Sequence, residues 1–181
     1  MLREIVCIPL VLSEFVECFP SDRRVGYGVY TNWAMASIRH QLRIKAPAAQ
    51  VFDRLTTGSG IASWWDTPAA ERSGYVEYWD FRPGPDHGVL RMKVVSSVPK
   101  ERVEWECVSR HEPSSPASAW TDTRITFALE DTGPATVLHF RHEAWDEENR
   151  FYPFCSFEWA MALRKLKQEC EASVASGNIG V

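Results

Sequence analysis

The 181-residue chain is long enough to bury one real hydrophobic core, and its 45% content of apolar residues excludes a globally disordered protein. Its 20 Lys and Arg against 24 Asp and Glu give a net charge of -4, which lacks the basic footprint of a nucleic-acid-binding domain. We therefore expect no nucleic-acid partner.

The first segment, residues 1–34, shows no sustained helical or strand periodicity. Its apolar run IVCIPLVL is too short to span a bilayer, and it lacks the basic flank and cleavage site of a secretory signal. We therefore expect no membrane span and assign 1–34 to an N-terminal extension. This is either a stretch upstream of a natural start at Met35 or a peripheral arm. One domain is expected over 35–176, with a short tail at 177–181.

The cysteine pattern predicts reduced thiols and a cytoplasmic protein. The five cysteines are odd in number and widely spaced, and no CxxC pair occurs, unlike a disulfide framework or a zinc site. The histidines are equally scattered. We therefore expect no metal and no cofactor.

The readable pattern begins at Ser37 with a strand followed by two short helices. Alternation with polar residues predicts one buried strand face, formed by Ile38, His40, Leu42 and Ile44. Pro47 suits the first turn of a helix, and GIASWW predicts a second helical segment.

A run of antiparallel strands follows, starting with the aromatic segment YVEYWDF at 75–81. Four more alternating segments are separated by turn residues. Their inward positions are Leu90, Met92, Val94, Val103, Trp105, Cys107, Ile125, Phe127, Leu129, Thr136, Leu138, Phe140 and His142. The segment HEPSSPASA at 111–119 has the composition of a loop.

The final element, about 153–174, has a helical period. Its main apolar stripe comprises Cys155, Trp159, Ala162, Leu163, Leu166 and Cys170, and a second apolar edge carries Phe154, Phe157 and Met161. The basic cluster Arg164, Lys165 and Lys167 indicates a solvated helix face. This order of elements predicts an α+β fold in which a curved antiparallel β-sheet wraps around a long C-terminal helix.

The order of these elements and several local motifs resemble the START-like, or SRPBCC, superfamily with its helix-grip (Bet v-like) fold. The matching stretches, across 37–174, are IRHQLRIKAPAAQVFDRLTTGSGIASWW, SVPKERVEWECV, TVLHFRHEAW and FEWAMALRKLKQECE. Within the superfamily, the chain is similar to relatives of the C-terminal domain of the activator of the ninety-kilodalton heat-shock protein ATPase. Glu158 departs from their pattern, in which Gly often precedes the helix tryptophan.

The resemblance implies a cavity between sheet and helix that holds a small hydrophobic or aromatic molecule. The candidate lining residues are Trp65, Tyr75, Glu77, Trp79, Trp105, Phe127, Phe140, His142, Phe157 and Met161. The alternative is that these rings only fill the core, where large aromatics supply much of the stability. Neighbouring Trp64 and Trp65 point in different directions, so one is expected to anchor the helix pair and the other to face the cavity mouth.

Three functions stay open on the sequence alone. The first is binding of a small hydrophobic ligand, a lipid included. The second is a cyclase- or aromatase-like enzyme in which His142, Glu77 and Tyr75 supply the polar groups, although no catalytic signature such as GxSxG or HExxH occurs and no catalytic residue is assigned. The third is a stress-related co-chaperone, with a chaperone contact or a homodimer as its partner.

Overall fold

In this computed structural model, which describes residues 35–84, 88–146 and 148–177, seven strands form one antiparallel sheet. The strands are β1 (Met35–Ile44), β2 (Ala69–Ser73), β3 (Val76–Phe81), β4 (Leu90–Val98), β5 (Arg102–Cys107), β6 (Arg124–Asp131) and β7 (Thr136–Asp146), in the sheet order β1-β7-β6-β5-β4-β3-β2. The helices are α1 (Ala48–Thr56), α2 (Gly58–Trp64), the 3-10 helix η1 (Pro116–Trp120) and α3 (Tyr152–Gly177). The extension predicted over 1–34 and the tail residues 178–181 lie outside the described residues.

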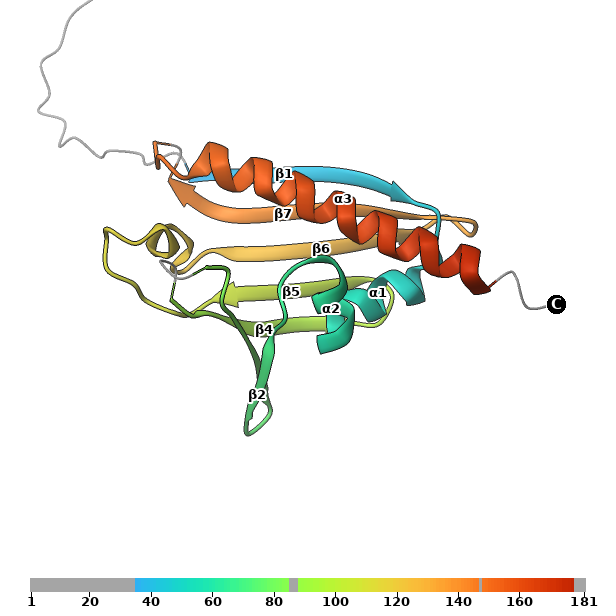
Figure 1. The fold of residues 1–181 in the computed structure, drawn as a ribbon, viewed down its shortest axis with the longest axis horizontal. Helices are drawn as coiled ribbons and strands as arrows, with labels where there is room; N and C mark the ends of the chain where they lie inside the picture. The colour runs from blue at the N-terminus through green and yellow to red at the C-terminus, as the bar shows by residue number, and fades with distance from the viewer. Residues whose placement is uncertain (1–34, 85–87, 147, 178–181) are drawn as a thin grey trace, which may run out of the picture. The chain divides into compact units, whose positions relative to one another are not determined.

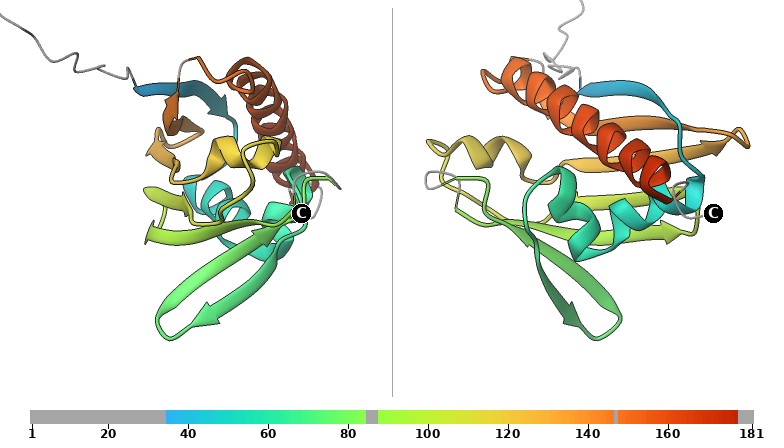
Figure 2. Two further views of the ribbon diagram at one scale, coloured as in Figure 1. Left: turned by 90° about the vertical axis from the view of Figure 1, so that its left-hand side faces the viewer. Right: turned by 45° about the vertical axis from the view of Figure 1, so that its right-hand side comes forward.

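The sheet curves around α3, and the described α-helices lie on its concave face (Figure 1). The long α3 crosses the sheet beside β1, whereas the short α1 packs against β5 and β6. Figure 2 shows the same layering from two other directions. The predicted helix-grip fold, with two short helices after the first strand and one long C-terminal helix, is confirmed.

Strand periodicity decides which side chains face the helices. The predicted inward positions of β5, β6 and β7 are buried, and the intervening Arg102, Arg124, His139 and Arg141 are exposed. The predicted stripe of α3 is buried as well except for the partly buried Ala162, with Leu163 and Leu166 at 0% exposure. The buried strand side chains pack against the buried stripe of α3 and form one core with it.

Polar contacts fasten the C-terminal half of α3 to α1 and to the loop before it. Gln50 of α1 donates to the carbonyl of Cys170 at 3.2 Å, and Arg54 donates to the Ser173 hydroxyl at 2.7 Å. The Lys45 amide donates to Glu171 at 2.8 Å, and this hydrogen bond lowers the pKa of that carboxyl. The end of α3 is therefore tied down, which fixes the helix over the sheet.

The β2–β3 hairpin extends beyond the helices and differs from the sequence expectation (Figure 1). The segment predicted as a strand from 75 begins at Val76, because Gly74 and Tyr75 form the tight turn that joins it to β2, with Gly74 at a φ of +61°. The sequence AAERS of β2 is poor in strand-forming residues, and this strand was not predicted.

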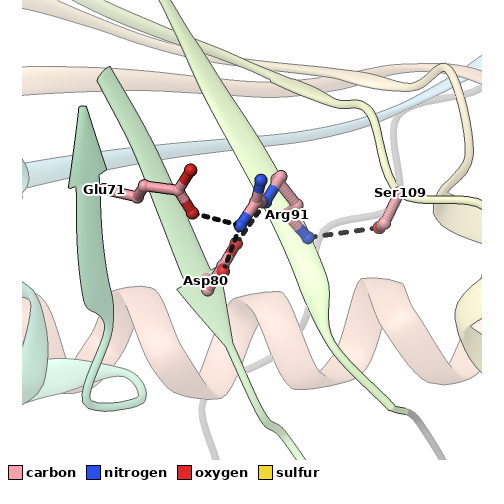
Figure 3. A network of polar contacts seen from close by, with 4 residues as sticks. All are labelled: Glu71, Asp80, Arg91 and Ser109. Carbon is pink, nitrogen blue, oxygen red and sulfur yellow. Dashed lines mark hydrogen bonds and ion pairs between the residues drawn. The ribbon is translucent and has the colours of Figure 1, made fainter. Parts of the chain in front are cut away.

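An ion-pair network on the convex face holds this hairpin to the rest of the sheet (Figure 3). Arg91 of β4 makes a bidentate pair with Asp80 of β3, with both contacts at 2.8 Å, and also reaches Glu71 of β2 at 2.5 Å. The Arg91 amide donates to the Ser109 hydroxyl. The hydrogen bond and charge of Asp80 raise the pKa of the Arg91 guanidinium, so one permanent cation links three neighbouring strands.

The two short helices meet at Gly60, where a side chain has no room. A Cβ at this position would lie 2.6 Å from the Asp53 carbonyl oxygen and 2.8 Å from the Arg54 Cα of α1. A Cβ at Gly58, in contrast, would meet the Trp79 ring at an ordinary 3.7 Å. The close approach at Gly60 sets the position of α2 and of the two tryptophans that follow it.

We predict that Gly60→Ala lowers the free energy of unfolding by about 1–3 kcal/mol, because the new methyl group must push α1 and α2 apart. The matched variant Gly58→Ala should stay within about 0.5 kcal/mol of the wild type, since its methyl group makes an ordinary contact. Urea denaturation measures both values. Equal stability of the two variants would contradict the tight helix contact.

Candidate functional site

A cavity of about 610 Å³ lies beneath α3. α2 and its end, the segments around the ends of β3 and β4, and η1 supply the rest of its wall. The lining residues are Trp64, Trp65, Pro83, Leu90, Trp120, Phe154, Cys155, Glu158, Trp159, Met161, Ala162, Arg164, Lys165 and Gln168. A volume of this size falls within the range of small-molecule sites, and the mainly apolar lining is typical of them.

The adjacent residues Trp64 and Trp65 at the end of α2 have different structural roles. Trp64 is 1% exposed and its indole donates to the Arg54 carbonyl at 2.8 Å, which anchors α2 to α1. At Trp65 the backbone leaves the helix, with φ -122° and ψ -122°, and the ring turns into the cavity wall. It lies 4.3 Å from Phe81 and 5.1 Å from Trp159, as ring centroids. Trp65 is thus the half-buried member of the pair and Trp64 the anchor.

Trp120 forms part of the cavity wall, although it was not among the predicted lining residues. The segment 111–119 was predicted as a loop, yet its second half forms η1, with Ser115 accepting from the Ala117 amide and Pro116 in the first turn. This Ser-Pro start is a recognised helix signal and could have indicated the turn. The Trp120 ring lies 5.7 Å from Trp159 and 4.6 Å from His142.

His142 is the centre of a fully paired, buried polar chain. The Trp159 indole donates to His142 Nδ1 at 2.9 Å, so this nitrogen carries no proton. The proton therefore sits on Nε2, which donates to the Thr123 hydroxyl at 2.8 Å, and that hydroxyl donates to the Trp120 carbonyl at 2.6 Å. Burial lowers the pKa of His142 from 6.5 to about 3. The imidazole is neutral at physiological pH, with both nitrogens occupied.

The surroundings of His142 are those of a core residue. The residue is 0% exposed and lies behind Trp120 and Trp159 rather than in the lining of the cavity. A general acid or base needs a nitrogen within reach of the reacting proton. The geometry is that of a satisfied core histidine that holds α3 to the sheet.

Several predicted lining residues lie in the core instead. Trp105, Phe127 and Phe140 are at most 1% exposed and do not line the cavity. Phe140 packs on Trp159 at 4.5 Å and Trp105 stacks behind Trp65 at 6.2 Å, so both support the wall from beneath. Trp79 is 5% exposed and lies under the start of α2 at Gly58.

Two predicted residues on the hairpin lie outside the cavity lining. Tyr75 is fully exposed at the turn, and Glu77 pairs with Arg72 of the neighbouring strand at 3.8 Å. Strand parity correctly puts Glu77 on the same face as Trp79, but at this point the hairpin extends past the helices that would cover that face. Neither residue can serve as a polar group of the cavity.

The second apolar edge of α3 lies only partly in the cavity lining. Phe154 and Met161 line the cavity mouth and are 59% and 46% exposed. Phe157 is 62% exposed and lies outside the lining. The charged lining residues Glu158, Arg164 and Lys165 were not among the predicted site residues. They share one helix face with the apolar lining, which is the signal that could have found them.

The thiols and acids of the described residues offer no second type of site. Cys107, Cys155 and Cys170 are free and buried, and burial raises the pKa of each thiol. Cys155 lines the cavity, but a raised pKa leaves its thiol protonated and a poor nucleophile. Within the described ranges no group of three or more His, Cys, Asp or Glu side chains could hold a metal ion. The helices described here also lack an apolar stretch long enough for a bilayer.

The buried histidine predicts a specific pH dependence of stability. Between pH 6.5 and about 3, the unfolded chain binds a proton at His142 that the folded protein excludes. The contribution is present above pH 6.5 and is lost as the pH falls. We expect the free energy of unfolding to drop by about 2 kcal/mol from pH 8 to pH 5 for this site alone.

His142→Gln should remove this part of the slope while lowering stability at both pH values. A matched core variant, Ile125→Val beside His142 in the neighbouring strand, should lose about 1 kcal/mol at each pH and keep the slope. Denaturant titrations at the two pH values measure all three proteins. An unchanged slope in His142→Gln would contradict the buried neutral imidazole.

The comparison with solved structures agrees with the fold. The Aha1 dimer from Colwellia psychrerythraea shares 29% identity, with a TM-score of 0.62 over 75% of this chain and 96% of that one. CalU16 from Micromonospora echinospora shares 21% identity, with a TM-score of 0.56 over 72% and 71%. The di-domain ARO/CYC StfQ from the steffimycin biosynthetic pathway shares 13%, with a TM-score of 0.60 over 78% and 52%. No curated protein sequence matches.

A family profile establishes the family that the sequence motifs resemble. The profile described as "Activator of Hsp90 ATPase homolog 1-like protein" matches residues 45–171, which is more than half of the chain. The match spans α1 to the C-terminal half of α3 and so includes most elements that build the cavity. This protein therefore belongs to the activator of Hsp90 ATPase homolog 1-like family, within the START-like superfamily that its sequence motifs resemble.

Proposed function

We propose that this protein binds a small hydrophobic or aromatic molecule in the cavity beneath α3. The observation that carries the proposal is the lining itself, where the indoles of Trp65, Trp120 and Trp159 meet around one space of about 610 Å³. Flat aromatic walls suit flat or hydrocarbon ligands, which gain from leaving water and from ring contacts.

The core beneath the cavity supports a binding role because it preorganises the wall. Trp159 is held by its bond to His142, and Trp65 rests on Phe81 and Trp105. A wall whose rings are already fixed loses little conformational entropy when a ligand enters. The cavity therefore offers binding without a large rearrangement.

The enzyme alternative has less support from the same geometry. The histidine that would act as acid or base has both nitrogens engaged, and the other two proposed polar groups lie on the projecting hairpin. Glu158 is the carboxylate of the lining, and none of the described lining residues is a histidine. A single exposed carboxylate is a poor basis for a catalytic mechanism.

An interaction role is a second candidate, favoured by the 29% identical Aha1 dimer and by the apolar edge of α3. Phe154, Phe157 and Met161 expose large apolar surfaces at i, i+3 and i+7 of one helix, a pattern suited to a protein partner. Light scattering measures whether the chain forms a homodimer, and an ATPase assay with purified Hsp90 measures activation. A monomer without effect on the ATPase rate would exclude this role.

The binding proposal predicts saturable uptake of phenylnaphthylamine, an uncharged apolar fluorophore. Ala162→Phe places a ring inside the cavity and should weaken this binding at least about tenfold. Ala160→Phe places the same ring on the exposed side of α3 and should bind like the wild type. A fluorescence titration measures the three dissociation constants.

Two results would contradict the proposal. One is a wild-type protein that gives no saturable signal, and the other is equal binding by the Ala162→Phe and Ala160→Phe variants. Thermal denaturation serves as the folding control, because bound ligand stabilises the native state by mass action. Wild type and Ala160→Phe should gain melting temperature with fluorophore, and Ala162→Phe should not.

A further inference from the structure

We propose that the cavity selects an amphipathic carboxylate, with its apolar body against the tryptophan wall and its acid group at Arg164 and Lys165. This inference rests on the proposed ligand-binding function and specifies the charge and the orientation of the ligand. The one feature that carries it is the uneven distribution of charge along the face of α3 that lines the cavity.

The polar lining of α3 is ordered along the helix axis. Glu158 comes first, and Lys165 lies seven residues later on the same face, about 10 Å further along the axis. Arg164 flanks Lys165, and the Gln168 amide follows one turn later. Hydrogen-bond donors therefore gather at one end of the cavity, and the one acidic group among the described lining residues lies at the other.

The two cations at the basic end have no protein partner in the described part of the chain. Some cations of the described residues are engaged, such as Arg91 with Asp80 and Lys167 with Glu171, whereas others, such as Arg39 on the outer sheet face, form no ion pair. No carboxylate lies within ion-pair distance of Arg164 or Lys165 among the described residues, and Lys167, which shares their sequence cluster, points to β1 and donates to the Arg43 carbonyl. Arg164 and Lys165 are thus available to a ligand.

The position of these side chains at the rim matches the form of an amphipathic ligand. Both residues line the cavity and are also exposed, which is the arrangement of a long side chain whose apolar stem covers the wall while its charge reaches water. An acid group held there remains partly hydrated, so it avoids the large cost of burying a charge. Its hydrocarbon body would extend towards Trp65, Trp120 and Trp159.

The opposing charge of Glu158 does not cancel the preference. The described lining residues include two cations and one carboxylate, and this carboxylate is two helical turns from Lys165. Exposed pairs contribute only modestly because water and salt screen them. We therefore expect a charge preference of about tenfold in affinity rather than absolute selectivity.

The test uses three competitors that share one aromatic body and differ in charge: naphthalenebutanoate, naphthalenebutanol and naphthalenebutylamine. Each displaces phenylnaphthylamine from the full chain at neutral pH and low salt. The wild type should bind the butanoate about tenfold more tightly than the amine, with the alcohol between them. High salt should reduce the difference.

Charge reversal supplies the decisive variant. Arg164→Glu with Lys165→Glu should reverse the order, so that the amine binds most tightly. The matched control, Arg39→Glu with Arg43→Glu on the exposed outer face of β1, changes the net charge equally and should keep the wild-type order. Glu158→Gln should tighten the butanoate about twofold.

The outcomes separate the two proposals. Equal affinity for the three competitors in the wild type, or the same order in the Arg164/Lys165 variant, would overturn the charge inference and leave hydrophobic binding intact. Displacement by none of the competitors, together with no uptake of the fluorophore, would overturn both. A reversal confined to the Arg164/Lys165 variant would support the carboxylate site.

Discussion

The hydrogen bond from Trp159 to His142 fixes α3 on the sheet, and the rest of the site depends on it. An indole N–H can only donate, so the bond sets the tautomer of the imidazole and directs its one proton to Thr123. Buried polar chains stabilise a fold only when every member is paired, and this chain ends on the Trp120 carbonyl. One side-chain contact thereby ties α3, β7 and η1 together, since each contributes a residue to the chain.

The same contact separates the core from the cavity. Trp120 and Trp159 present one side to His142 and another to the cavity, so they seal the polar chain from any molecule that binds there. Phe127 of β6 and Phe140 of β7 pack against Trp159, and Trp105 of β5 stacks on Trp65, so the core holds the cavity wall in place. The histidine that the enzyme alternative would need as a polar group thus has a structural role, and the surface left for a ligand is apolar with charges at its rim.

The sequence predicts those parts of the structure that follow from local periodicity. The strand faces of β5 to β7 and the buried stripe of α3 follow from periods of two and 3.6 residues, and the two short helices follow from Pro47 and the GIASWW segment. Parity cannot tell whether another element covers a strand face, which is why Glu77 was expected to line the cavity although it lies on the uncovered hairpin. Tyr75 was expected there because its turn was predicted as the start of the strand. Trp120 and the Arg164–Lys165 pair were missed although local signals existed, because the Ser-Pro start of η1 and the helix face shared with the apolar lining do not show which distant elements these residues meet.

His142 is a neutral structural residue sealed from the cavity, and NMR of its ring nitrogens tests this most directly. A long-range proton–nitrogen correlation reports which nitrogen carries the proton and whether it titrates. We expect the Nε2-protonated tautomer, assigned by its loss in His142→Gln, to persist unchanged from about pH 8 to pH 5. An imidazole that gains its second proton near pH 6.5, or that carries its proton on Nδ1, would contradict the Trp159 bond and reopen the catalytic role.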